Sequence, residues 1–158
     1  MTDEIRAYPA QAEETKKDQS GRSLVLPARI DEMTALRKFL LEEEGMTERE
    51  KKKICLVAEE IFVNICSYAY NSEAPGEVWI HTLITDDEFC ITFADKGLAY
   101  NPLADIRDPE NYNPDEQIGG LGKMMSFTIM DRQYYEYRNG FNVLTLVKSL
   151  RREQGGTK

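Results

Sequence analysis

The chain has few of the residues that build metal clusters and disulfide frameworks. Its 158 residues include one histidine, His81, and three cysteines, Cys55, Cys66 and Cys90, with no C-x-x-C pair. Structural zinc sites and disulfide-rich domains need several such residues at short spacing. The sequence therefore indicates neither kind of site, and we expect three reduced cysteines within apolar segments of the core.

Long apolar runs and an excess of positive charge are also missing. No stretch reaches the ~20 apolar residues of a membrane helix, and residues 1–4 lack the basic and apolar regions of a signal peptide. The 28 acidic and 20 basic residues give a formal net charge of -8, whose overall field opposes binding to nucleic acid and to anionic membranes. We expect a cytoplasmic protein that binds neither of them.

Apolar side chains are scarce at both ends of the chain. Residues 1–21 are rich in Gln, Glu, Lys, Asp and Ser, and they cannot bury enough apolar surface to offset the entropy lost on ordering. We expect a mobile N-terminal arm over residues 1–21, one domain over residues 22–150 and a frayed C-terminus over residues 151–158. A chain of this length suits one domain with a substantial core.

The periodicity of the apolar residues predicts the order β, α, α, β, β, a long loop, then α, β, β. A capping box of Thr47 and Glu50 starts the central helix, and Asn139-Gly140 is typical of a tight hairpin turn. The order predicts an α+β fold, a two-layer α/β sandwich with helices on one face of a mixed or antiparallel sheet. We expect the first hairpin to be buried largely on one face. The predicted strands cover residues 23–27, 78–84, 89–93, 133–137 and 141–149, and the predicted helices cover residues 31–45, 47–70 and 122–130.

The central helix carries a carboxylate and a carboxamide beside its apolar face. Glu60 and Asn64 are four residues apart, so their side chains lie one turn apart on the edge of the apolar stripe. Such a pair can bind Mg²⁺ through the carboxamide oxygen and a coordinated water, or remove a proton from a nucleophile. The alternative is a boundary glutamate and a buried asparagine bonded to backbone. The predicted stripe consists of Ile54, Val57, Ala58, Ile61, Ile65 and Tyr68.

Two further polar features stand where predicted elements end or begin. Asp95 and Gly97 follow a strand, where the carboxylate can accept a hydrogen bond from an exocyclic amine and the glycine allows close approach of a ligand or backbone. A glycine-rich run precedes a helix, whose free N–H groups and positive end attract phosphates. The alternatives are a turn-capping aspartate and a simple hinge. The run consists of Gly119, Gly120, Leu121 and Gly122.

The order of these motifs is more specific than any one of them. E-x-x-x-N on a helix, D-x-G after a strand, a long loop over residues 95–118 and G-G-L-G before a helix resemble the Bergerat or HATPase fold (GHKL) of histidine kinases, the Hsp90 chaperone, gyrase B and MutL. The chain is most similar to the small stand-alone members of this family, which are anti-sigma factors with serine kinase activity. The resemblance runs from about residue 24 to 150. The long loop is expected to act as a lid.

The resemblance implies that the cofactors are ATP and Mg²⁺. It implies that Asn64 ligates Mg²⁺, that Glu60 is the catalytic base or orients water, and that Asp95 binds the adenine amine. Gly97 would make room for the base, and Thr145 would support the adenine through Asp95 or a water. The phosphates would be enclosed by the glycine-rich run, Gly119, Gly120, Leu121 and Gly122.

The resemblance also implies protein partners. The acceptor would be a serine on a STAS-type anti-anti-sigma protein, which competes with a sigma factor for binding to this chain. Arg37 would contact a protein partner, with a solvated helix face as the alternative interpretation. A homodimer through the first strand is consistent with the same likeness.

The chain departs from the family pattern at three places. Ala99 replaces a glycine that many relatives have after D-x-G, and Tyr68 replaces a histidine four residues after the asparagine. Gln117 stands before the glycine run, where some kinase members have an arginine near the terminal phosphate, and Arg107 and Lys123 are the nearby cations. The missing arginine bears on phosphoryl transfer more than on binding. The sequence therefore leaves two functions open, a serine kinase that also binds a sigma factor, and an ATP-responsive interaction switch without transfer.

Overall fold

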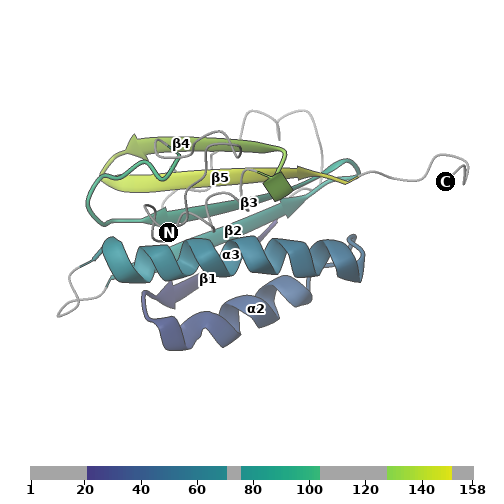
Figure 1. The fold of residues 1–158 in the computed structure, drawn as a ribbon, viewed down its shortest axis with the longest axis horizontal. Helices are drawn as coiled ribbons and strands as arrows, with labels where there is room; N and C mark the ends of the chain where they lie inside the picture. The colour runs from purple at the N-terminus through teal and green to yellow at the C-terminus, as the bar shows by residue number, and fades with distance from the viewer. Residues whose placement is uncertain (1–20, 71–75, 104–127, 151–158) are drawn as a thin grey trace, which may run out of the picture.

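The computed structural model describes residues 21–70, 76–103 and 128–150. Within these ranges the chain forms five strands, two α-helices and a short 3-10 helix (Figure 1). The expected N-terminal arm lies outside the described residues except for Gly21, and so do residues 151–158 and the glycine-rich run 119–122. The elements are β1 (Arg22–Pro27), η2 (Ile30–Glu32), α2 (Met33–Leu41), α3 (Glu48–Tyr68), β2 (Glu77–Ile84), β3 (Glu88–Asp95), β4 (Arg132–Arg138) and β5 (Phe141–Ser149).

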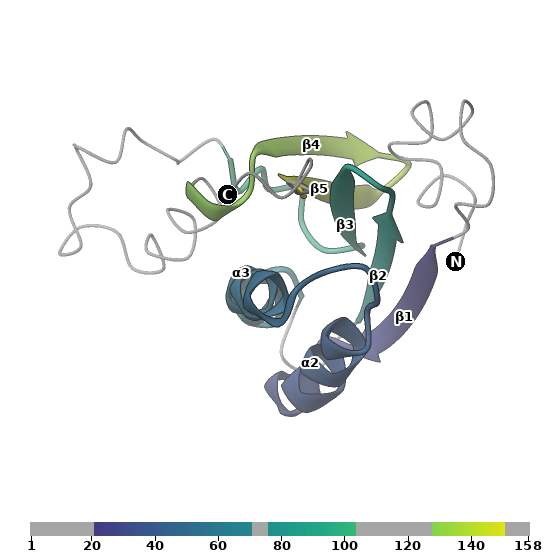
Figure 2. The same cartoon turned by 90° about the vertical axis from the view of Figure 1, so that its right-hand side faces the viewer.

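The five strands form one sheet in the order β1-β2-β3-β5-β4, and every neighbouring pair is antiparallel. Both α2 and α3 lie on the same face of this sheet (Figure 2). The predicted α+β class and two-layer arrangement are therefore confirmed, and of the two sheet types expected from the sequence the described strands form the antiparallel one. No helix within the described ranges has the length and apolar content needed to cross a membrane.

Helix α3 forms the centre of the helical layer. Its capping box is present: the Thr47 hydroxyl accepts from the Glu50 N–H at 3.1 Å, and the Glu50 carboxylate accepts from the Thr47 N–H at 2.9 Å. The predicted apolar stripe is buried from Ile54 to Ile61, but Tyr68 is 66% exposed, so the stripe is not buried as far as this residue. The reason is that the last turn of α3 borders a pocket. The buried residues of α3 are Ile54, Cys55, Val57, Ala58, Ile61 and Phe62.

The sheet face below the helices is apolar. Alternate residues of the three central strands point toward α2 and α3 and join one core cluster, since side chains alternate between the faces of a strand. The expectation that the first hairpin is buried on one face was wrong for β3, which is the middle strand and is buried on both faces. Of the three cysteines expected in the core, Cys55 and Cys90 are buried and Cys66 is half-buried. The core-facing strand residues include Val78, Ile80, Ile91, Phe93, Leu144 and Leu146.

Two local features fix the ends of the sheet. Asn139 and Gly140 both have positive φ, 54° and 82°, as a tight hairpin turn requires, and this sets the register of β4 on β5. At the opposite edge, Glu43 is 4% exposed and its Oε1 accepts from Arg22 Nη1 at 2.8 Å and Thr82 Oγ1 at 3.0 Å. The chain after α2 is thereby tied to β1 and β2.

Candidate functional site

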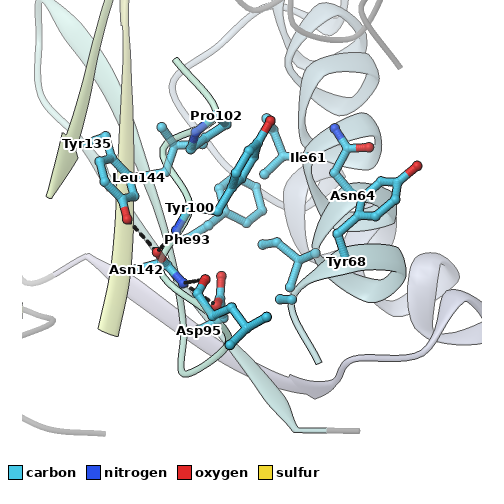
Figure 3. Close-up of a pocket in the computed structure, with 13 residues that line it drawn as sticks. Ile61, Asn64, Tyr68, Phe93, Asp95, Tyr100, Pro102, Tyr135, Asn142 and Leu144 are labelled. Atoms are coloured by element: carbon cyan, nitrogen blue, oxygen red, sulfur yellow. Dashed lines mark hydrogen bonds between the residues drawn. The ribbon is translucent and has the colours of Figure 1, made fainter. Parts of the chain in front are cut away.

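A cavity of about 410 Å³ opens between the C-terminal half of α3 and the ends of β3 and β5. This volume lies in the range typical of small-molecule and cofactor sites. Its walls are mostly apolar, with a few polar groups that converge from different elements (Figure 3). The residues that matter for its chemistry are Asn64, Tyr68, Asp95, Tyr100, Tyr135 and Asn142.

Asp95 is the buried carboxylate of the cavity. It ends β3 and is 5% exposed, and its Oδ1 accepts from the Gly97 N–H at 2.8 Å and from Asn142 Nδ2 at 3.0 Å. No donor among the described residues reaches its second oxygen, Oδ2. Burial raises the pKa of the Asp95 carboxyl, and the hydrogen bonds from Asn142 and Gly97 oppose that rise. A buried acceptor of this kind fits an N–H donor of a ligand.

Gly97 is required by the protein backbone itself. A Cβ at this position would lie 2.2 Å from the carbonyl oxygen of Ala69, at the end of α3, and the neighbouring Leu98 N–H donates to the same oxygen at 3.2 Å. The close contact of Gly97 is therefore with the C-terminal end of α3, against which the segment after Asp95 packs. A role of Gly97 in making room for a base stays a prediction.

Asn64 and Glu60 are placed differently. Asn64 lines the cavity, whereas Glu60 is half-buried one turn earlier and is not among the lining residues. The neighbouring Glu59 pairs with Arg37 at 2.5 Å, so the guanidinium expected to meet a protein partner lies against α3 while its side chain remains 55% exposed. Within the described ranges, no group of three or more His, Cys, Asp or Glu residues could hold a metal. A Mg²⁺ ion at Asn64 would therefore need oxygens from a bound ligand and water, which is the coordination this ion prefers.

Thr145 does not lie where the sequence interpretation put it. It is fully buried, its hydroxyl is 3.3 Å from that of Thr92, and it lies on the sheet face away from Asn142 and Leu144, because neighbouring residues of β5 alternate between faces. The predicted support of a ligand by this residue is contradicted. Asn142 holds Asp95 instead.

Asn142 was missed as a site residue, although the sequence contained a signal for it. It lies directly opposite Asp95 in the register of β3 and β5. A polar amide two positions before Leu144 on a buried strand needs hydrogen-bond partners on the core side. Counting forward from the Asn139-Gly140 turn would have placed Asn142 at the start of the last strand.

The fold and this cavity define the class of protein. Residues 25–148 match the histidine kinase-like ATPase domain, and the chain belongs to this family. Membership implies ATP binding, and the apolar walls with the open Asp95 acceptor are suited to an adenine ring and its amine. The glycine-rich run, Arg107 and Lys123 lie outside the described residues.

One curated protein and one solved structure are similar to this chain. The serine/threonine-protein kinase BtrW of Bordetella bronchiseptica (strain ATCC BAA-588 / NCTC 13252 / RB50) is 32% identical over 94 residues, which cover 59% of this chain and 66% of the relative. The crystal structure of the RsbU and RsbW domains of Rv1364c from Mycobacterium tuberculosis has a TM-score of 0.58 at 16% identity. That match covers 84% of this chain and 33% of the other, and it supports the fold alone. The chain thus spans just under two thirds of the curated relative and a third of the solved chain.

Proposed function

We propose that this protein is an ATP-dependent serine/threonine kinase of the anti-sigma type. It binds MgATP in the cavity beside Asp95, phosphorylates a serine on a STAS-type partner and sequesters a sigma factor in the cytoplasm. The observation that carries the proposal is that Asp95 and Asn64, a buried carboxylate and a carboxamide from distant parts of the chain, line one cavity.

The adenine end of the site rests on Asp95. Its Oδ1 is occupied by two protein donors, so Oδ2 is the oxygen that accepts from the exocyclic amine. The apolar side chains of Phe93, Ile61 and Leu144 line the same cavity and provide contact area for the ring faces. A purine with an amine at this edge satisfies the acceptor, whereas a carbonyl there would repel it.

The phosphate end rests on α3. Phosphoryl transfer depends mainly on positioning and on neutralising charge, so a Mg²⁺ ligand, a base and groups around the phosphates form a sufficient set. Asn64 would hold Mg²⁺ together with phosphate oxygens and water. Glu60, one turn earlier on the same helix, would take the proton from the attacking serine hydroxyl. The glycine-rich run over residues 119–122 would enclose the phosphates.

The partner assignment is part of the proposal. The name of the relative BtrW describes a serine/threonine-protein kinase, which supports kinase activity. Arg37 remains half-exposed beside Glu59 and would contribute to the surface for the STAS-type protein or the sigma factor. Homodimer formation through β1, an edge strand of the sheet, belongs to the same proposal.

A second candidate is an ATP-responsive switch that changes partner affinity without transfer. Two observations favour it: Glu60 is absent from the cavity lining, and Gln117 stands where some kinase members have an arginine. The two candidates share the nucleotide site and differ in the fate of the terminal phosphate.

A labelling experiment separates them. The purified protein is incubated with γ-labelled MgATP and STAS-type proteins, and label transfer to serine is measured for wild type, Glu60→Gln and the control Glu48→Gln on the exposed first turn of α3. We expect transfer by wild type and the control and none by Glu60→Gln. Equal labelling by Glu60→Gln would remove Glu60 from the mechanism. ATP binding without any transfer would favour the switch.

A further inference from the structure

The side chain of Asn142 is the centre of the hydrogen-bond network behind Asp95. Its Nδ2 donates to Asp95 Oδ1 at 3.0 Å and to the Leu98 carbonyl at 2.9 Å, with a longer contact of 3.4 Å to the Gly97 carbonyl. Its Oδ1 accepts from the Tyr100 N–H at 3.0 Å and from the Tyr135 hydroxyl at 2.5 Å. One amide therefore connects β5 with the whole segment after β3.

Only one orientation of this amide satisfies its neighbours. Tyr100 offers a backbone N–H, which can only donate, and Leu98 offers a backbone carbonyl, which can only accept. If the amide were rotated by half a turn, Nδ2 would face the Tyr100 N–H, and Oδ1 would face the Asp95 carboxylate and the carbonyls of Leu98 and Gly97, which can only accept. The backbone of residues 98–100 thus fixes which end of Asn142 meets Asp95.

The amide has no capacity left for a ligand. Both hydrogens of Nδ2 and both lone pairs of Oδ1 have protein partners, although Asn142 borders the cavity and is 7% exposed. Direct ligand contact is therefore not its role. The residue acts on the neighbouring carboxylate, whose Oδ1 it occupies.

We propose that Asn142 is a positioning residue that sets the base selectivity of the site. Its amide, held by Tyr100, Leu98 and Tyr135, keeps Asp95 oriented with Oδ2 as an acceptor toward the cavity, so that the site selects purines with an exocyclic amine over 6-oxo purines. This inference rests on the proposed ATP site.

The chemistry of the carboxylate supports this role. Burial raises the pKa of Asp95, and the hydrogen bond from Asn142 is the first of the two contacts that oppose the rise. Without that donor, Asp95 would take up a proton at higher pH and could donate to a 6-oxo group. The titratable groups coupled to Asp95 are the hydroxyls of Tyr70 and Tyr135, whose own pKa values are raised by burial.

The test compares ATP with inosine triphosphate, which differs at the 6-position of the purine. Dissociation constants are measured from pH 5 to pH 9 for wild type, Asn142→Val and Asn142→Thr. We expect wild type to prefer ATP by about 100-fold or more and Asn142→Val to lose about tenfold or more of that ratio. As the pH is lowered, the ATP affinity of Asn142→Val should begin to fall at a higher pH than that of wild type. Asn142→Thr has the shape of valine plus a donor and should recover part of the ratio.

Thr145→Val is the matched control, because it is buried on the same strand but on the other face. It should keep the wild-type ratio and pH profile. If Asn142→Val fails to fold, Tyr135→Phe removes one donor to the amide, and its ratio should fall about threefold.

A folded Asn142→Val whose preference for ATP over inosine triphosphate and whose pH profile are unchanged would overturn the proposal. An unchanged preference in Tyr135→Phe would overturn it too. So would an Asn142→Thr variant that recovers none of the preference lost in Asn142→Val. If wild type binds neither nucleotide, the proposed function fails first, which is a distinguishable result.

Discussion

The hydroxyl of Tyr70 accepts a hydrogen bond of 2.7 Å from the backbone N–H of Lys96, the residue between Asp95 and Gly97. The same hydroxyl donates to the Glu77 carbonyl at 2.7 Å. Tyr70 therefore joins the start of β2 to the end of β3, directly beside the carboxylate that is proposed to bind adenine. The position of Asp95 depends on the chain that follows α3.

Tyr70→Phe tests this connection. The variant keeps the ring, which packs against Gly76, and removes both hydrogen bonds. We expect ATP affinity to fall about threefold to tenfold, since a lost hydrogen bond of this kind is worth about 0.5–1.5 kcal/mol. Calorimetric titration measures the change, and Tyr137→Phe, whose side chain is largely exposed, serves as the control. An unchanged dissociation constant would show that Tyr70 does not position Asp95.

Gly97→Ala tests the packing of the segment after Asp95 on the end of α3. The new Cβ would lie 2.2 Å from the Ala69 carbonyl oxygen, and backbone atoms must move to relieve the overlap. We expect a loss of about 1–3 kcal/mol in the free energy of unfolding together with weaker ATP binding.

Gly140→Ala is the contrasting variant, because its Cβ meets no atom within 4 Å and only its positive φ opposes the change. Its expected loss is about 1–2 kcal/mol, with ATP affinity unchanged. Thermal unfolding and calorimetry measure both quantities. Normal ATP binding by Gly97→Ala would contradict the role of this contact.

Loss of the Arg22–Glu43 ion pair, whose carboxylate is buried, should lower the free energy of unfolding more than loss of an exposed ion pair does. Arg22→Ala leaves the buried Glu43 carboxylate with the Thr82 hydroxyl, so we expect a loss of about 2–4 kcal/mol, reduced by the partial exposure of Arg22. Arg29→Ala breaks two exposed pairs, with Asp31 and with Glu32, and should change stability far less than Arg22→Ala, because solvent screens exposed charges. Urea unfolding measures both variants. Equal losses would contradict the structural role of Glu43.

We expect Asp95→Asn to keep or gain stability at pH 7 while it loses affinity for ATP. Because the folded-state pKa of Asp95 is raised, this carboxyl favours folding at pH values below its ordinary pKa of 3.8, and that contribution is lost as the pH rises through the folded-state value. At pH 7 the ionised carboxylate therefore lowers stability. The variant has no such group, so we expect it to be at least as stable as wild type at pH 7, with a smaller advantage at pH 3.5, and to bind ATP poorly. Urea unfolding at both pH values tests the sign. A variant less stable at pH 7 would contradict it.

Some features of the fold could be read from local patterns. Thr47 and Glu50 start α3, and Asn139-Gly140 turns the chain between β4 and β5, because both signals act over a few residues. The order of the helical and strand segments predicted helices on one face of a sheet, as α2 and α3 are found (Figure 2). Asn64 and Asp95 were predicted to meet, and the structure places them in one cavity.

Other features depend on distances between segments far apart in the sequence. Thr145 was assigned to the site because it lies on the correct strand, but strand alternation turns it to the other face, and Asn142 takes its place. For Gly97 the sequence left open whether a ligand or backbone approaches closely, and the close contact that the structure shows is with the backbone of Ala69. Both outcomes depend on which backbone atoms of α3, β3 and β5 come together, which residue type alone does not reveal.

The central claim is that the cavity beside Asp95 binds MgATP, and calorimetric titration of MgATP and MgADP into the purified protein tests it most directly. We predict that wild type binds ATP, that Asp95→Asn abolishes binding, and that Asn64→Ala removes its dependence on Mg²⁺. A well-folded wild-type protein that binds no nucleotide would contradict the account.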